Sequence, residues 1–470
     1  MQLPDSTLKD NPALVFAPQM GRFAPGDSAS PRWVYLGWDA ERRRKIRTLW
    51  PSGNEVFIGS QLDKVAQDIK EEFISWTGVM GGRQKNAVRW FASSLSANNA
   101  LQSDFFPLIC YDQLIGRWIR DGVRSYADII YVEDPELFAA IRRRCDRRSD
   151  IRFFGFGRLQ QWREKGVMWL RIPYAHSRHW LNGICLWLKA RLIFTAADLR
   201  RQIEQSKNSI HIFSWVEDRC FNRSPAFTDP YTGRLEDVLK QNGRSVQRLT
   251  FHRLSIAHLR ALRKCASAFL VSTRFLRLRD IFLSAGRFFF IDDLSAVGYF
   301  MEADYTPLIR REVLRENGNP DYLDLHLWYL TMCRIAATVS PLNGVLIYPF
   351  ENQKWEKLML LALKSSGTAV WKTVGYQHSS VGPLYLFYHI ALTQRPYLPL
   401  PRRAGVLQSI NVGRQCLPHS SASHRTPRRA DSSTGALIRG YLFFSRARDF
   451  CLCRQASWNA RANPFISFNA

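Results

Sequence analysis

Several signatures of familiar protein classes are missing from this sequence of 470 residues. None of its nine cysteines belongs to a group with zinc-ligand spacing, and only Cys451 and Cys453 lie close together. The segments around Gly78 and Gly155 lack the G-K-[ST] and G-x-G-x-x-G patterns that bind phosphates. No Asp-x-Asp follows a predicted strand. The sequence therefore predicts no metal site, no P-loop and no resident cofactor.

The sequence also lacks a long apolar run and a secretory signal. Its longest apolar stretch, residues 179–197, is interrupted by Lys189 and Arg191, which makes it too charged for a membrane-spanning helix. Two interpretations stay open: a buried helix between domains, or a helix lying on a membrane surface. The first residues, MQLPDSTLKDNP, have no basic start followed by an apolar core. We therefore expect a cytoplasmic protein, peripheral at the inner face of the cell membrane if this helix contacts lipid.

Basic residues outnumber acidic ones, and the formal net charge is +26. Residues 392–470 hold twelve arginines, no lysine and only two acids, Asp431 and Asp449, so they contribute +10 and leave +16 for the first 391 residues. A basic body indicates an anionic partner, such as a nucleotide, a phosphorylated lipid, an acidic membrane face or nucleic acid.

Residues 392–470 form an aberrant tail in which no helical or strand period is sustained, and we expect it to be disordered. One interpretation is an arginine-rich arm that binds anions. The other is translation in a shifted reading frame. The loss of both Lys and Glu favours the shifted frame, because ordinary disordered tails usually keep these residues.

Ahead of the tail, short apolar runs alternate with amphipathic segments. After a loose lead-in at residues 1–32, strands are predicted within RWVYLGWD, EVFIGS and DIRFFGFG and at residues 129–132. Asp134 and Pro135 begin a helix that ends in a basic turn. This alternation predicts an α/β domain with a parallel sheet at residues 33–165, followed by a helical connector at 166–205.

A second series of strands and helices occupies residues 206–391. Residues 210–215 read as a strand, a helix follows and stops at Gly243, and another strand comes next. The long helix within LDLHLWYLTMCRIAATVS then leads to the apolar run GVLIYPF. The chain is therefore expected to contain two Rossmann-like α/β domains before the tail.

The stretch IYPFENQKWEKLMLLALKSSG raises the sharpest functional question. Residues 345–350 read as a strand buried on both faces, and Asn352 is placed to cap the helix after it. One face of that helix carries Trp355 and other apolar residues, while its lysines, Lys357 included, fall off this face. The strand within GTAVWKTVGYQHS comes next. Glu351 and the turn 377–379 should thus lie at the carboxyl ends of neighbouring strands, where open α/β sheets bind ligands.

The pair YPFENQKWEK and GYQHSSVGPLYLFYH resembles bacterial surface-carbohydrate (O-antigen type) biosynthesis proteins, which are similar to two-domain Rossmann-like glycosyltransferases of the GT-B type. The resemblance covers mainly residues 206–390. It implies transfer of a sugar from a nucleotide donor to a lipid-linked or saccharide acceptor, with the nucleotide sugar as substrate and with possible contact to an anionic membrane.

The two motifs supply the candidate site residues. Glu351 and His378 have the right chemistry for a catalytic base or an acceptor anchor. A substrate-binding role is expected for the remaining motif positions, which are Asn352, Glu356, Tyr376, Gln377 and Ser379. Trp355 lies on the apolar helical face, which favours packing over stacking on a sugar.

Two alternatives to an active transferase stay open. The charge and the aromatic content suggest a basic nucleic-acid-binding protein, but the tail holds much of that charge and no helix-turn-helix, zinc or RNA-recognition signature is present. The sequence therefore argues against a nucleic-acid partner. A non-catalytic remnant of a transferase, disabled by a C-terminal truncation, is the other alternative.

Overall fold

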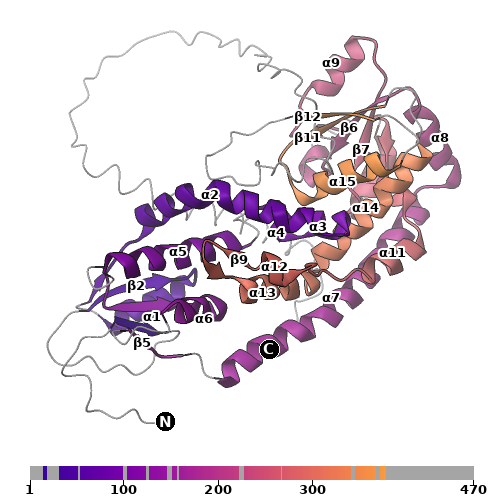
Figure 1. Cartoon of the computed structure of the whole chain (residues 1–470). Coiled ribbons are helices and arrows are strands. Elements are labelled where there is room, and N and C mark those ends of the chain that lie inside the picture. Colours follow the sequence, from indigo (N-terminus) through magenta and orange to yellow (C-terminus); the bar gives the residue numbers. More distant parts are fainter. Residues whose placement is uncertain are drawn as a thin grey trace, which may run out of the picture. The chain divides into compact units, whose positions relative to one another are not determined.

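The computed structural model describes residues 14–17, 31–50, 53–98, 103–122, 126–145, 151–155, 158–221, 227–265, 267–339, 344–366 and 371–376. These residues form an α/β protein with two parallel sheets, A and B, of five strands each (Figure 1). Both sheets belong to one compact unit, Met1–Phe57 with Val65–Leu400. The short segment Ile58–Lys64 is assigned with residues 401–470 to a second unit, of which only Ile58–Lys64 lies within the described residues.

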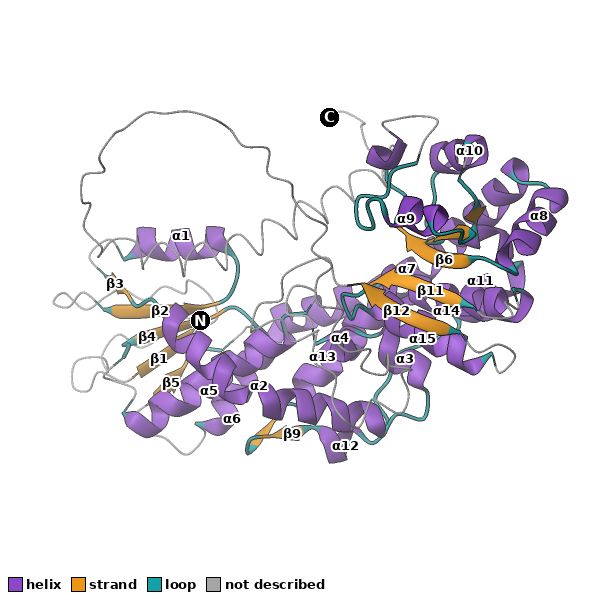
Figure 2. Ribbon diagram, turned by 90° about the horizontal axis from the view of Figure 1, so that it is seen from above, coloured by secondary structure: helices purple, strands orange, loops and turns teal. Residues whose placement is uncertain are grey.

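Sheet A consists of β1 (Leu14–Ala17), β2 (Arg32–Leu36), β3 (Asn54–Glu55), β4 (Ile129–Val132) and β5 (Ile151–Phe153). Its strand order is β3-β2-β4-β1-β5, and every neighbouring pair is parallel (Figure 2). The stretch expected to be a loose lead-in thus supplies β1, which lies inside the sheet between β4 and β5. Its Phe16 and Ala17 side chains are completely buried. The four apolar residues of β1 are too few to stand out among the prolines and glycines around them.

The helices between the strands of sheet A are α1 (Ala40–Leu49), α2 (Gly59–Gly82), α3 (Ala87–Ala92), α4 (Ser94–Ala97), α5 (Phe105–Asp121) and α6 (Pro135–Arg144). Helix α6 begins where the sequence predicts it. The Asp134 carboxylate accepts hydrogen bonds from the backbone N–H groups of Glu136 and Leu137, and Pro135 takes the first helical position. Arginines fill the last turn, where positive charge complements the helix dipole.

Two helices, α7 (Arg158–Ile193) and α8 (Ala196–Ser206), separate the two sheets in the sequence. They include the connector expected at residues 166–205. A capping box begins α8, since the Thr195 hydroxyl accepts from the Asp198 N–H at 3.1 Å and the Asp198 carboxylate accepts from the Thr195 N–H at 2.9 Å. Across the described residues, no helix combines the length and apolarity needed to cross a bilayer.

Sheet B consists of β6 (Ile210–Ser214), β7 (Val246–Thr250), β8 (Phe269–Leu270), β11 (Val345–Pro349) and β12 (Lys372–Tyr376). Its order is β12-β11-β6-β7-β8, and all neighbouring strands are parallel. Numbered along the chain, the strands of sheet B follow the Rossmann order 3-2-1-4-5. The strand order therefore reverses between β6 and β11, which is the topological switch point of the sheet.

The remaining elements after α8 are η2 (Asp218–Phe221), α9 (Leu235–Gln241), α10 (Ile256–Lys264), η3 (Ser272–Phe275), α11 (Leu278–Ala285), α12 (Leu294–Val297), β9 (Tyr299–Phe300), β10 (Ala303–Asp304), α13 (Thr306–Asn317), α14 (Pro320–Thr338) and α15 (Lys354–Ser365). The two short strands β9 and β10 pair antiparallel.

The segment between β8 and β11 returns to the helices of sheet A. The Tyr305 hydroxyl donates to Asp112 of α5 at 2.7 Å, and Gln113 donates to the same hydroxyl at 2.9 Å. Arg311 of α13 forms an ion pair with Asp134 at the start of α6. Residues near 305–311 therefore contact the 33–165 region, although the sequence pattern placed them in the 206–391 domain.

Candidate functional site

The carboxyl edge of sheet B is the natural place for a ligand, because open α/β sheets bind ligands at the switch point outside their strand ends. Strands β6 and β11 meet there, with Ile347 opposite Ile212. The chain leaves β6 at Ser214 and leaves β11 at Pro349. Glu351 and Asn352 follow β11 directly, so the first sequence motif lies at this edge.

The loop after β11 is tied to the end of β12. The Phe350 N–H donates to the Tyr376 carbonyl at 2.8 Å, which brings the two sequence motifs together. Gly375 allows this approach, since a Cβ at that position would come within 3.0 Å of the Phe350 Cβ. Asn352 has φ 53°, in the left-handed region that asparagine tolerates better than most residues. Helix α15 has Gln353 at its N-cap, so the cap lies one residue after the predicted Asn352.

Glu356 shapes this loop through its carboxylate. One oxygen accepts from the N–H groups of Glu351 (3.0 Å) and Gln353 (3.2 Å), and the other accepts from Glu351 (3.1 Å) and Asn352 (2.9 Å). The side chain is only 1% exposed, and this burial raises the pKa of Glu356 to about 8. Direct substrate contact, predicted from the sequence, would require these hydrogen bonds to break. We therefore assign Glu356 to positioning the loop.

Lys357 is buried, although the helical period places it off the apolar face of α15. It is 2% exposed because α3 and α4 pack against this side of the helix. Its side-chain nitrogen Nζ donates to the backbone carbonyl of Ser96 at 2.7 Å. Burial lowers the pKa of Lys357 to about 7. A buried carboxyl group and a buried amine thus follow each other in the chain at the start of α15.

Aromatic rings form the packing layer beneath the loop. Trp355 is 7% exposed and stacks on Phe213 of β6 with ring centroids 4.4 Å apart, which agrees with the packing role expected for it. Trp215, just after β6, meets Trp355 edge-on at 5.2 Å and lies 4.8 Å from Phe251. Trp215 is half-buried and directly follows β6, the strand on the other side of the switch point. The sequence analysis did not select Trp215 as a site residue, although its place at the end of a predicted buried strand could have indicated it.

The predicted site residues are only partly placed by the structure. Glu351 is half-buried at the edge, and Tyr376 is 44% exposed beside it. Gln377, His378 and Ser379 lie outside the described residues. The last described residue of the second motif, Tyr376, ends β12 at the edge where the chain leaves β11 toward Glu351.

His252 is a further residue near this edge that the sequence analysis missed. It follows β7, is completely buried, and has no hydrogen-bond partner for either ring nitrogen among the described residues. Burial lowers the pKa of His252 to about 3, so the ring is neutral. Its neighbour Arg253 pairs with Asp321 at 2.6 Å and with Asp324. Complete burial separates His252 from any ligand at the edge.

A second array of polar residues joins three helices. His179 of α7 lies 2.7 Å from the Ser284 hydroxyl of α11 and 2.6 Å from the Asp324 carboxylate of α14. The order of groups is that of a hydrolase triad, but His179 and Ser284 are completely buried. The Ser284 hydroxyl also donates to the Ile281 carbonyl at 2.9 Å. A nucleophile must reach its substrate, so we assign this array to fixing α7 against α11 and α14.

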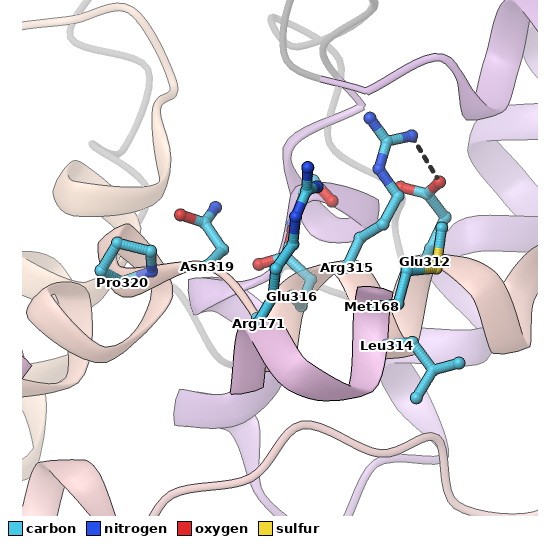
Figure 3. A pocket seen from close by; sticks show the side chains of 10 residues that line it. Met168, Arg171, Glu312, Leu314, Arg315, Glu316, Asn319 and Pro320 are labelled. Carbon is cyan, nitrogen blue, oxygen red and sulfur yellow. Dashed lines mark hydrogen bonds and ion pairs between the residues drawn. The ribbon is translucent and has the colours of Figure 1, made fainter. Parts of the chain in front are cut away.

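A cavity of about 240 Å³ lies where α7, α13 and the start of α14 meet (Figure 3). It is lined by Ser94, Met168, Arg171, Glu312, Leu314, Arg315, Glu316, Gly318, Asn319 and Pro320. Arg315 pairs with Glu312 at 3.2 Å, and the Glu316 carboxylate accepts from the Ser94 N–H at 2.8 Å. With two arginines and two glutamates, the lining has no excess of positive charge to bind a phosphate.

No group of three or more His, Cys, Asp or Glu side chains within the described part of the chain is arranged to hold a metal ion. The sequence matches no family model, and neither a curated protein nor a solved structure matches it.

Proposed function

We propose that this chain is a glycosyltransferase-like protein of bacterial surface polysaccharide assembly, transferring a sugar from a nucleotide donor to a lipid-linked or saccharide acceptor. The observation that carries the proposal is the position of Glu351 at the switch point of a sheet with the Rossmann strand order. The two parallel sheets are compatible with a GT-B arrangement. The motif ENQKWEK and the described residues of GYQHS, Gly375 and Tyr376, lie at the same sheet edge, and both motifs resemble those of such proteins.

The chemistry requires one base and one anion-binding group. The acceptor hydroxyl attacks the anomeric carbon of the donor, its proton passes to the base, and the bond to the nucleoside diphosphate breaks. Glu351 is the base or acceptor anchor in this proposal, and His378 is the second candidate. Partial burial keeps the Glu351 carboxylate at the edge without sealing it from solvent.

The hydrogen bonds of the backbone before α15 limit the places where the leaving phosphate can bind. A helix N-terminus commonly supplies N–H groups to phosphate. Here the N–H groups of Glu351, Asn352 and Gln353 already donate to Glu356. We therefore place the acceptor side at the first motif and the phosphate side at the second motif, with His378 as its charged or hydrogen-bonding group.

The test is release of nucleoside diphosphate from UDP-, GDP- and dTDP-linked hexoses by the purified chain, with ligand-observed NMR as the binding assay. Glu351→Gln should keep donor binding and lower turnover by about a hundredfold, as expected for loss of a general base. His378→Ala should weaken donor binding. The matched control is Glu204→Gln, which removes an exposed carboxylate on α8 that pairs with the neighbouring Lys207. Failure of every donor to bind the wild-type chain would contradict the proposal.

A further inference from the structure

The outer side of α7 is apolar and exposed to solvent. The outer stripe of α7 consists of Leu170, Tyr174, Leu181, Leu188 and Leu192. Leu170 is 73% exposed, Leu181 66% and Leu192 82%. Successive members are four or seven positions apart, so they share one side of the helix. Large apolar side chains are rarely exposed in such a continuous row without an interaction partner.

The opposite side of α7 is anchored in the protein. Ala175, His179 and Ala190 are completely buried, and a Cβ at Gly183 would come within 2.7 Å of the Ile281 side chain. His179 bridges Ser284 and Asp324 through its two ring nitrogens. These contacts fix the rotation of the helix about its axis. The outer stripe of α7 therefore stays directed away from α11 and α14.

The exposed apolar surface extends from α7 onto α11, which packs beside it (Figure 1). Trp180 contacts Phe282 edge-on with centroids 5.7 Å apart, and Phe282 is 52% exposed. Trp169, one residue before the stripe, is 62% exposed. Tryptophan and tyrosine side chains prefer the boundary between water and hydrocarbon, because each has an apolar ring and a polar group.

The charge on this part of α7 has one sign. Residues 166–193 contain no Asp and no Glu, but they contain Arg171, Arg178, Lys189 and Arg191. Arg191 lies over the Trp187 ring at 4.2 Å and donates to a backbone carbonyl. Residues 166–193 of the helix offer no acidic partner to the other three, Arg171, Arg178 and Lys189. An apolar stripe whose own stretch of helix carries only basic charges is complementary to a surface that is both apolar and anionic.

This charge pattern distinguishes among possible occupants. A second copy of the chain would place its own arginines and lysines opposite these, with no acid in the stretch to compensate. The tail at residues 392–470 is also strongly basic, with twelve arginines and two acids. An anionic bilayer accepts leucines in its hydrocarbon boundary and binds arginine and lysine at its headgroups.

We propose that the outer stripe of α7, together with Trp180 and Phe282, is a docking surface for an anionic lipid bilayer, on which α7 lies parallel to the membrane plane. This inference does not depend on sugar transfer and stands or fails separately from it. If the acceptor is lipid-linked, docking through α7 would also bring the protein to its acceptor.

The test is co-flotation of the full chain with vesicles of phosphatidylcholine alone or of phosphatidylcholine mixed with phosphatidylglycerol. Wild-type protein should bind the mixed vesicles and bind pure phosphatidylcholine much more weakly. A stripe variant, with Leu170→Ser, Leu181→Ser and Leu192→Ser, should bind the mixed vesicles at least about tenfold more weakly, since three apolar anchors are removed.

Two further variants separate the stripe from nonspecific effects. The control variant carries Leu49→Ser and Val238→Ser, which are 52% and 47% exposed on α1 and α9, and it should bind like wild type. The charge variant, with Arg171→Gln and Lys189→Gln, should lose about thirtyfold on mixed vesicles, since each basic residue contributes about 1 kcal/mol near an anionic surface. Circular dichroism should show that every variant keeps the wild-type helix content.

Several results would overturn the proposal. Wild-type binding that the stripe variant retains would assign the binding to another region, such as the basic tail. Absence of wild-type binding to either vesicle would exclude a membrane role. A dimer of the wild-type chain that the stripe variant converts to a monomer, without vesicle binding, would assign the stripe to a second copy.

Discussion

At the carboxyl edges of both sheets, a glutamate side chain accepts hydrogen bonds from the backbone of a strand–helix loop, but the two glutamates do so from different positions. In sheet A, Glu133 after β4 accepts from the Tyr35 hydroxyl at 2.8 Å and from the N–H groups of Trp38 and Asp39 at 2.6 and 3.1 Å. In sheet B, Glu356 accepts from the N–H groups of the loop after β11. In both places one carboxylate gathers the N–H groups of a strand–helix loop.

The two carboxylates differ in where they come from. Glu133 belongs to the neighbouring strand end and reaches across the edge of sheet A to the loop after β2. A Cβ at Gly37 would come within 2.1 Å of its carboxylate, so this edge is filled by the side chain itself. Glu356 belongs to the first turn of α15, the helix that follows the loop, so the loop is held by a carboxylate of its own strand–loop–helix unit. Glu351 and Tyr376 are thereby left at the edge of sheet B, which is why we place the ligand there.

The largest effect should come from removing the Glu356 carboxylate. Glu356→Leu would take from the N–H groups of residues 351–353 the acceptor that Glu356 provides, and we expect the free energy of unfolding to fall by about 4 kcal/mol. Glu356→Gln keeps one acceptor oxygen and should lose about 2 kcal/mol. Chemical denaturation measures both values. Equal losses in the two variants would show that hydrogen bonding by Glu356 does not hold the loop.

The pH dependence of stability should reveal the buried amine of Lys357. Its pKa is lowered to about 7 in the folded protein from 10.5, so the unfolded chain binds more protons between these values and stability rises with pH there. Lys357→Met removes this contribution. The difference in unfolding free energy between wild type and variant should change by about 4 kcal/mol from pH 7 to 10.5, in favour of wild type at the higher pH. A difference independent of pH would contradict a buried, neutral amine.

A smaller effect should follow from Gly37→Ala at the edge of sheet A. The new methyl group would overlap the Glu133 carboxylate, and we expect a loss of about 2 kcal/mol. Glu133→Ala alone should lose about 1 kcal/mol. The double variant should lose less than the sum of the single losses, because it removes the 2.1 Å overlap with the carboxylate, although the Cβ of residue 133 at 2.6 Å and the Tyr35 ring at 2.9 Å remain close to the new methyl group. Thermal unfolding of the four proteins gives this cycle, and strict additivity would contradict the overlap.

Local rules predicted the regular parts of this fold well. The strand at residues 129–132, the start of α6 at Pro135 and the buried face of α15 all follow from apolar period and capping residues. Each depends on neighbours within a few positions in the chain. The same rules place Glu351 at a strand end, because the strand and the helix on either side of it are both regular.

Features that depend on distant contacts could not be predicted. Lys357 is buried because α3 and α4, more than 250 positions earlier, cover its side of the helix, as its 2.7 Å bond to Ser96 shows. The array of His179, Ser284 and Asp324 joins residues up to 145 positions apart. The role of Glu356 depends on the left-handed backbone at Asn352, which could not be predicted from the pattern of residues around it.

Hydrogen–deuterium exchange of the full chain, with and without UDP- and GDP-linked hexoses, tests whether the donor binds at the carboxyl edge of sheet B. A bound donor should protect the amides at 350–353 and 376–379 and those of the residues after β6, and it should leave the loop 36–39 of sheet A unchanged. Two results would contradict the assignment of the site to sheet B. One is protection confined to the loop 36–39, and the other is a bound donor that leaves amide exchange at the carboxyl ends of β11 and β12 unchanged.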